Sequence, residues 1–177
     1  MTYFIGYLGT EEVNKYYRSI TADLAGRFGV KYLAENVPPH ITLKYPFDSD
    51  DLSSIEGTLV DILKDKKPIP FSISSFDEFK GKEGTIFLSI DKNPALQSFI
   101  KDSIIKLGKE SDYYAFGNEF HLHMSIARSL DSEKARLVWE YLKTLPKPYF
   151  DLLFDNLTVF IFDSGVWKIK KTFKIPS

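Results

Sequence analysis

The pattern of apolar and polar positions predicts strands and helices that alternate along the whole chain. Residues that switch between apolar and polar every second position are typical of half-buried strands. Such runs predict strands over residues 2–8, 40–45, 71–79, 85–90, 121–128, 149–155, 157–162 and 166–175. Apolar residues spaced by three and four predict amphipathic helices. These helices are predicted over residues 11–28, 52–62, 94–107 and 132–145.

Local signals place the ends of several of these elements. Thr10 is a good N-cap for the first helix, and Gly29 is a good stop signal. Pro38 and Pro39 force an extended backbone before the strand that begins at His40. Residues 81–84 form a plausible hairpin connection. Because strands and helices intermingle and the short connections favour antiparallel pairing, we expect an α+β fold.

Composition narrows the classes of protein that fit this pattern. The chain has 177 residues, 44% of them hydrophobic, and a net charge of -1. A broad nucleic-acid groove would need a more basic surface, so a nucleic-acid end or a small phosphorylated molecule is the better expectation. The absence of cysteine excludes disulfides, thiol nucleophiles and zinc-thiolate sites. No membrane span or secretory signal is visible, which makes a cytoplasmic location the default prediction.

One short pattern occurs twice. Residues 39–43 read Pro-His-Ile-Thr-Leu and residues 122–126 read Leu-His-Met-Ser-Ile, and the two histidines are 123 − 40 = 83 residues apart. Each copy has the form histidine, apolar residue, hydroxyl residue, apolar residue. We therefore predict that residues 1–177 form a single two-lobed domain, in which two pseudo-symmetric antiparallel sheets flanked by helices face each other across an active groove.

The repeated pattern carries the candidate chemistry. Because residues two apart in a strand point to the same face, His40 lies beside Thr42, and His123 lies beside Ser125. Two imidazoles across a groove can take a proton from a nucleophile and give one to a leaving oxygen near neutral pH. The two hydroxyls can donate hydrogen bonds to the non-bridging oxygens of a phosphodiester. No metal or cofactor is required by this chemistry.

The segments PPHITL at 38–43 and HMSI at 123–126 resemble the paired motifs of the two-histidine (2H) phosphoesterase superfamily, the 2'-5' RNA ligase family. The resemblance implies a bilobal α+β fold and metal-independent action on 2',3'-cyclic phosphates, related nucleotide cyclic phosphates or 2'-5' linkages. By the same resemblance, His40 and His123 would be the acid–base pair. Thr42 and Ser125 would bind the phosphate.

Residues beside the motifs are secondary candidates for substrate binding. Lys44 is two residues beyond Thr42, so it should lean toward the groove, where its ammonium could meet a phosphate. A solvated lysine at the strand edge is the competing interpretation. Three aromatic residues flank the motifs and are candidates for stacking on a base: Tyr45, Phe47 and Phe120. Arg128 has the opposite parity from His123, so a surface salt link is the favoured interpretation.

The main hypothesis is a metal-independent phosphodiesterase that hydrolyses 2',3'-cyclic phosphates or related nucleotide or RNA-end phosphodiesters, with ligation as the reverse reaction. The sequence does not say which histidine is the acid. A second hypothesis is a non-catalytic binding module that recognises phosphorylated nucleotides or RNA termini. A third is a metalloenzyme in which His121 joins the two motif histidines on zinc. In the main hypothesis His121 lines the groove, and no cofactor or obligate protein partner is expected.

Overall fold

A computed structural model describes residues 1–108 and 121–176 of the chain. Within these residues the strands and helices follow the predicted order. The strands are β1 (Thr2–Leu8), β2 (His40–Asp48), β3 (Ile69–Phe79), β4 (Gly84–Ile90), β5 (His123–Leu130), β6 (Phe150–Phe154), β7 (Asn156–Asp163) and β8 (Val166–Lys174). The helices are α1 (Glu11–Phe28), the short 3-10 helix η1 (Leu33–Glu35), α2 (Ser53–Leu63), α3 (Pro94–Lys106) and α5 (Ser132–Leu142).

The strands form two four-stranded sheets. The first has the order β2-β1-β7-β8 and the second the order β5-β4-β3-β6. All neighbouring strands are antiparallel. The predicted α+β class with two antiparallel sheets is therefore confirmed. Several boundaries differ from the prediction by one to three residues. The largest differences are that β2 continues to Asp48 and that the last helix ends at Leu142, while the strand expected from residue 121 begins at His123.

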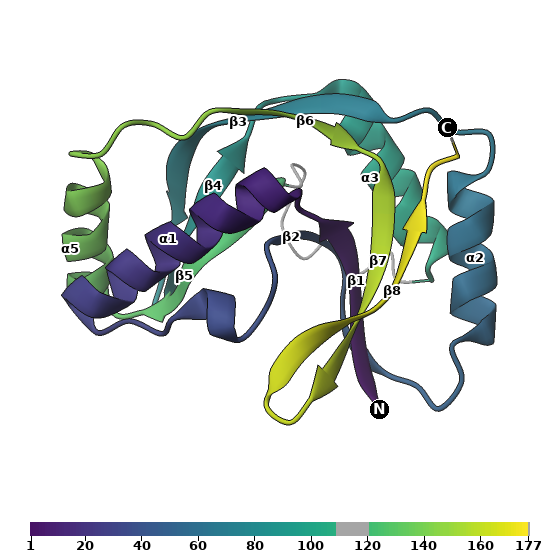
Figure 1. Cartoon of the computed structure of the whole chain (residues 1–177), viewed down its shortest axis with the longest axis horizontal. Coiled ribbons are helices and arrows are strands. Elements are labelled where there is room, and N and C mark those ends of the chain that lie inside the picture. The colour runs from purple at the N-terminus through teal and green to yellow at the C-terminus, as the bar shows by residue number, and fades with distance from the viewer. Residues whose placement is uncertain (109–120, 177) are drawn as a thin grey trace.

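Each sheet carries two helices, and the chain crosses between the lobes to place them (Figure 1). α2 contacts β8 and α3 contacts β2, so both pack on the first sheet. α1 and α5 both contact β5, which belongs to the second sheet. The N-terminal helix thus covers the sheet that is built mostly from later residues. The segment from β1 to α1 therefore connects the first sheet to the helical layer of the second.

The predicted helix ends are present. Thr10 is the N-cap of α1, and its side chain accepts a hydrogen bond from the backbone N–H of Val13. Gly29 ends the helix with φ 60, a left-handed conformation that glycine adopts without steric cost. Asp131 caps α5 by accepting from the N–H of Lys134 at 2.8 Å. These caps fix where each helix starts relative to the strand before it.

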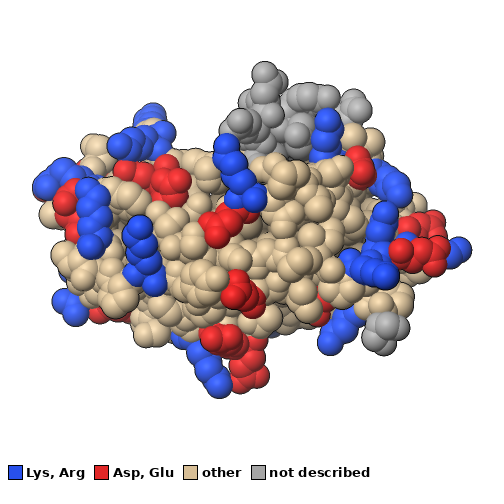
Figure 2. Space-filling view, turned by 90° about the horizontal axis from the view of Figure 1, so that it is seen from above, with Lys and Arg blue, Asp and Glu red and all other residues tan. Residues whose placement is uncertain are grey.

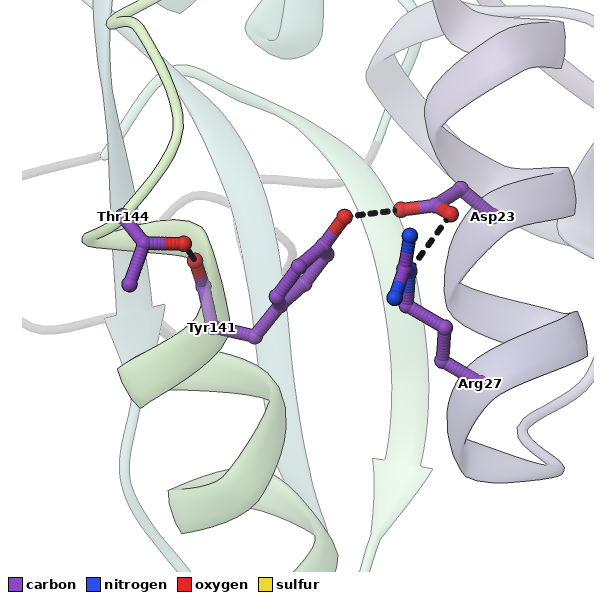
Figure 3. A network of polar contacts seen from close by, with 4 residues as sticks. All are labelled: Asp23, Arg27, Tyr141 and Thr144. Atoms are coloured by element: carbon purple, nitrogen blue, oxygen red, sulfur yellow. Dashed lines mark hydrogen bonds and ion pairs between the residues drawn. The ribbon is translucent and has the colours of Figure 1, made fainter.

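A polar network joins α1 to α5 on the outer face of the second sheet (Figure 3). The hydroxyl of Tyr141 donates to Asp23 Oδ2 at 2.6 Å, and Arg27 Nε donates to the other oxygen at 2.7 Å. The Arg27 guanidinium also lies 4.8 Å from the centre of the Tyr141 ring. The hydrogen bond from Tyr141 is the main reason that the pKa of Asp23 is lowered. The network holds the two helices at a fixed separation above β5.

The surface carries both signs of charge. In Figure 2, acidic and basic side chains are interspersed over the face that is drawn, with broad areas of other residues between them. This distribution agrees with the net charge of -1. Among residues 1–108 and 121–176, no helix is long and apolar enough to cross a membrane.

Candidate active site

The two histidine motifs begin strands that meet at the junction of the lobes. β2 is an edge strand of the first sheet and β5 is an edge strand of the second. These two strands contact each other near the centre of the molecule (Figure 1). His40 is the first residue of β2, and His123 is the first residue of β5. The fold therefore brings the two distant motifs together from opposite sheets.

Both imidazoles are held in the same way. Nδ1 of His40 lies 2.8 Å from the carbonyl oxygen of Pro38, and Nδ1 of His123 lies 2.8 Å from the carbonyl oxygen of His121. Because a carbonyl oxygen can only accept, Nδ1 carries the proton in each neutral ring. The other nitrogen, Nε2, then has a free lone pair. Each motif thus orients its ring through the backbone two residues upstream and leaves Nε2 for chemistry.

Aromatic rings back both histidines. The His40 ring lies 4.6 Å from the Phe4 ring and 5.6 Å from the Phe160 ring, between ring centres. The His123 ring lies 4.9 Å from Phe79 and 5.0 Å from Phe87. These contacts restrict ring rotation and remove water from one side of each imidazole. Both histidines nevertheless remain half-buried rather than fully enclosed.

This environment lowers the pKa of both histidines. Burial is the largest cause, because it penalises the charged imidazolium. It lowers the pKa of His40 to about 4, with smaller contributions from the positive charges of Arg128 and His123. Burial also lowers the pKa of His123, assisted by His121 and Arg128, and the hydrogen bond to the His121 carbonyl opposes the shift. The charge of His123 therefore contributes to the lowered pKa of His40.

The two motif hydroxyls occupy matching positions. Thr42 pairs with Gly6 in the β1–β2 ladder, and Ser125 pairs with Phe87 in the β4–β5 ladder. Both are half-buried, whereas the intervening apolar residues of each motif are buried in the core. The alternation places each hydroxyl on the same strand face as its histidine. The structure thus supplies two imidazole–hydroxyl pairs on two contacting strands.

Both motif strands contain an irregularity just after the hydroxyl. In β2 the pairing steps from Gly6↔Thr42 to Ile5↔Lys44, which is one residue on β1 for two on β2. In β5 the pairing steps from Phe87↔Ser125 to Ile86↔Ala127 in the same way. One extra residue in a strand is a β-bulge, and it reverses the facing of the residue that directly follows it. Each ladder contains a second register shift further along. The two bulges fall at equivalent positions of the repeated motif.

The bulge shows that the expected position of Lys44 is wrong. Lys44 is buried and pairs with Ile5, so it faces the side opposite to Thr42. Its ammonium donates a hydrogen bond of 2.8 Å to the carbonyl oxygen of Leu107, at the end of α3. A cation at a helix C-terminus is favoured by the orphan carbonyls there. Lys44 therefore fastens a helix to the outer face of the first sheet, away from the groove.

The structure also corrects the expectation for Arg128. Ala127 is buried, and Arg128 follows it in a stretch where the β4–β5 pairing shifts a second time before Leu130. Arg128 is exposed, and its charge lowers the pKa of both motif histidines. Within the part of the chain that the structure describes, Arg128 makes no ion pair with a carboxylate. It therefore contributes a positive charge near the motif histidines rather than half of a surface salt link.

The remaining predicted residues have different outcomes. His121 is exposed and precedes β5, and its ring lies 5.6 Å from Phe79, on the same aromatic wall as His123. Tyr45 is half-buried on β2. Its role in stacking stays a prediction. Phe120 lies outside the described residues.

Metal ligation by the histidines finds no geometric support. Among residues 1–108 and 121–176, no group of three or more His, Asp or Glu side chains is placed to hold a metal ion. His40, His121 and His123 therefore do not form the three-ligand cluster that the zinc alternative requires.

Sequence reasoning missed several residues that build the site. Gly6 lies opposite Thr42, where a Cβ would come within 2.6 Å of the Ile41 carbonyl oxygen. Only glycine lets the two strands approach this closely beside the motif. The rings of Phe4 and Phe79 were also missed as histidine supports, because aromatic residues are common in this chain and come from distant strands. A glycine within an otherwise apolar strand was the one local signal available.

The site consists of two half-buried imidazoles, each packed against aromatic rings, and two hydroxyls on two contacting edge strands. This arrangement is suited to phosphoryl transfer by acid–base catalysis. Comparison with known proteins assigns the family. The family model described as the 2'-5' RNA ligase superfamily matches residues 17–165. The chain therefore belongs to the 2'-5' RNA ligase superfamily, as its motifs had indicated.

Individual relatives agree with this assignment. A protein of Geobacillus kaustophilus named "Putative phosphoesterase" is 28% identical over 142 residues, which are 77% of this chain and 78% of that protein. The crystal structure of the Thermus thermophilus protein TT0787 matches with a TM-score of 0.66 and 14% identity, covering 99% of this chain and 98% of that one. Escherichia coli LigT complexed with 3'-AMP matches with a TM-score of 0.58 and 14% identity, at the same coverages. These structural likenesses show the same fold.

Proposed function

We propose that the protein is a metal-independent phosphodiesterase that opens 2',3'-cyclic phosphates or related nucleotide and RNA-end phosphodiesters. The observation that carries the proposal is the matched support of two imidazoles. Each donates Nδ1–H to a backbone carbonyl at 2.8 Å, and each leaves Nε2 available from one of two contacting strands. Phosphodiester hydrolysis needs one proton acceptor and one proton donor on opposite sides of a phosphorus atom.

The reaction follows from these positions. Nε2 of one histidine takes a proton from water as the water oxygen bonds to phosphorus. The bond from phosphorus to the departing ribose oxygen breaks, and the other histidine, as imidazolium, gives its proton to that oxygen. The product is a phosphomonoester with a free ribose hydroxyl, and proton exchange with solvent restores both rings. Thr42 and Ser125 donate hydrogen bonds to the non-bridging oxygens as charge builds there. Ligation would use the same arrangement with a 5'-hydroxyl oxygen in place of water as the nucleophile.

We assign the base role to His40 and the acid role to His123. Burial lowers the pKa of His40 to about 4, so this ring is neutral near pH 7 and suited to accept a proton from water. Burial lowers the pKa of His123 as well, so its role as the acid depends on the bound phosphate. A bound phosphate anion stabilises an imidazolium beside it, which raises the fraction of protonated His123 in the complex.

The test is turnover of 2',3'-cyclic mononucleotides, ADP-ribose cyclic phosphate and 2'-5' oligonucleotides by the purified protein, with and without EDTA. We expect hydrolysis that EDTA does not change and that falls by about 10²–10⁴-fold in His40→Asn and in His123→Asn. Lys82→Met, an exposed substitution between β3 and β4, is the control and should keep full activity. Full activity in either motif variant, or saturable nucleotide binding with no product from the whole panel, would contradict the proposal. The second outcome would instead support the binding module.

Comparison with relatives supports the class of substrate. Matching curated proteins are named phosphoesterases, and E. coli LigT has been crystallised with 3'-AMP, a nucleoside phosphate. A cyclic phosphate opened with departure of the 2'-oxygen yields the same type of 3'-phosphate product.

A further inference from the structure

A cavity of about 310 Å³ lies between the two lobes on the Arg128 side of the groove. Its walls come from three separate parts of the chain: the segment between α1 and β2, the end of β5 with the start of α5, and the β7–β8 hairpin. The residues that matter for its chemistry are Lys31, Arg128, Lys134, Phe162 and Trp167. We call this cavity the Arg128 pocket.

The charge of the Arg128 pocket is of one sign. Lys31, Arg128 and Lys134 all line it, and none of its lining residues is acidic. In the described parts of the chain these three side chains have no carboxylate within ion-pair distance. Three unpaired cations around one cavity in a protein of net charge -1 indicate a site for an anion.

An aromatic wall connects this pocket to the reacting centre. The Phe162 ring lies 5.2 Å from the Trp167 ring, which lies 4.7 Å from the Phe4 ring. Phe4 in turn contacts His40 at 4.6 Å. The wall is fixed across the lobes, because the backbone N–H of Trp167 donates to the Asn36 carbonyl at 2.8 Å. Exposed aromatic faces beside a nucleotide site are surfaces on which a base can stack.

The position of Arg128 links the pocket to the phosphate site. Arg128 is three residues beyond Ser125 on the same strand, and it lines the pocket. Three residues of strand span about 10 Å. A nucleotide that places its cyclic phosphate at Ser125 can therefore reach the pocket with a phosphate on the other side of its ribose. The charge of Arg128 already acts on both motif histidines, so the two anion sites are electrostatically continuous.

We propose that the Arg128 pocket binds a second phosphate of the substrate, with the neighbouring base against Trp167. This inference rests on the proposed function and refines its substrate class. The preferred substrate carries a 2',3'-cyclic phosphate and, across the ribose, a further phosphate. That phosphate belongs either to a nucleotide with a 5'-phosphate or to the linkage of an oligonucleotide end. A nucleoside cyclic phosphate without a second phosphate leaves the three cations unused.

The experiment compares kcat/KM for three substrates: adenosine 2',3'-cyclic phosphate, its 5'-phosphorylated form, and the dinucleotide ApA ending in a 2',3'-cyclic phosphate. We expect the wild-type protein to prefer the second substrate over the first by at least about tenfold, because phosphate contacts with Lys and Arg are charge-assisted. In the double variant Lys31→Ala/Lys134→Ala this preference should fall below about threefold. A preference for the dinucleotide that is lost in the same variant would identify an oligonucleotide end as the source of the phosphate.

The matched control is Lys66→Ala/Lys67→Ala, which removes two exposed lysines that line a different cavity beside α3. It should keep the wild-type preference. Equal kcat/KM for all three substrates in the wild-type protein, or an unchanged preference in Lys31→Ala/Lys134→Ala, overturns the inference.

A binding measurement separates failure of the pocket from failure of the proposed function. Calorimetric titration with 3'-AMP and with adenosine 3',5'-bisphosphate requires no turnover. We expect at least about tenfold tighter binding of the bisphosphate, reduced by the pocket double variant but not by the control. If the protein hydrolyses no substrate yet shows this difference, the proposed function fails and the pocket stands. If both ligands bind equally, the pocket fails whatever the activity.

Discussion

The first motif strand, β2, and the second, β5, are alike where they serve chemistry. Both begin with histidine, carry a hydroxyl two residues later, and bulge immediately after it. Their first five residues have the same sequence of half-buried and buried positions. Both histidines also hold Nδ1 on the carbonyl two residues upstream. The histidine and the hydroxyl thus occur at equivalent positions of two different sheets. A reaction in which groups act on one phosphorus atom from opposite sides requires such a pair.

The same strands differ directly after the hydroxyls. The bulged position is Lys44 in β2 and Ala127 in β5, and the next residue is Tyr45 in one and Arg128 in the other. Lys44 is used for structure, whereas Arg128 brings a charge near the motif histidines. The comparison teaches that the catalytic apparatus is symmetric, while its electrostatic environment and the adjoining pocket are not.

The largest expected effect breaks the symmetry between the histidines. His40→Asn should lose about 10²–10⁴-fold in activity both on a 2',3'-cyclic phosphate and on a p-nitrophenyl phosphodiester, since either reaction needs the base. His123→Asn should show that loss on the cyclic phosphate but less than about tenfold on the p-nitrophenyl ester, because p-nitrophenolate leaves without a proton. Steady-state rates on both substrates measure this. The reverse pattern would exchange the two roles, and equal losses would contradict the assignment.

The hydroxyls test whether the symmetry extends beyond the imidazoles. Thr42→Val and Ser125→Ala should each lower kcat by about 10²-fold, since each removes one donor to the developing negative charge. Thr42→Ser and Ser125→Thr, which keep the hydroxyl, serve as controls and should retain most of the activity. A loss confined to one strand would show that only one motif contacts the phosphate.

Lys44 tests the structural half of the comparison. Lys44→Met should lower the free energy of unfolding by about 1–3 kcal/mol, because the part-buried Leu107 carbonyl loses its donor. It should change kcat/KM by less than about threefold. Urea denaturation and cyclic phosphate hydrolysis measure the two quantities, with Lys82→Met as an exposed control. Normal stability with strongly reduced activity would place the ammonium in the groove after all.

Arg128 gives the smallest and most specific effect. Its charge lowers the pKa of both histidines, so Arg128→Gln should raise both values. A base with a raised pKa becomes protonated at higher pH, and an acid with a raised pKa keeps its proton to higher pH. Both limbs of the kcat/KM profile on adenosine 2',3'-cyclic phosphate should therefore move to higher pH. Arg136→Gln, on the exposed side of α5, should leave the profile in place. An unmoved profile in Arg128→Gln would show that its charge does not reach the reacting groups.

Much of this arrangement could be predicted from the sequence, because alternation along a strand fixes which residues share a face. His40 with Thr42 and His123 with Ser125 follow from that rule alone. Lys44 was assigned to the wrong face because a bulge adds one residue and reverses the alternation directly beyond it. No local feature of the sequence signals a bulge in either motif strand, since the bulge depends on pairing with β1 and β4. The Arg128 pocket was also invisible, since its walls come from segments far apart in the chain.

The central claim is that two imidazoles act on one phosphate from opposite sides through Nε2. Nitrogen-15 NMR of the imidazole rings tests it most directly, because the chain has three histidines and His121→Asn simplifies the assignment. In the free protein near pH 7 we predict that His40 and His123 both carry their proton on Nδ1. Titration with 3'-AMP should then perturb both Nε2 signals with one common dissociation constant. A response from one ring only, different dissociation constants for the two rings, or a proton on Nε2 in the neutral form would contradict the account.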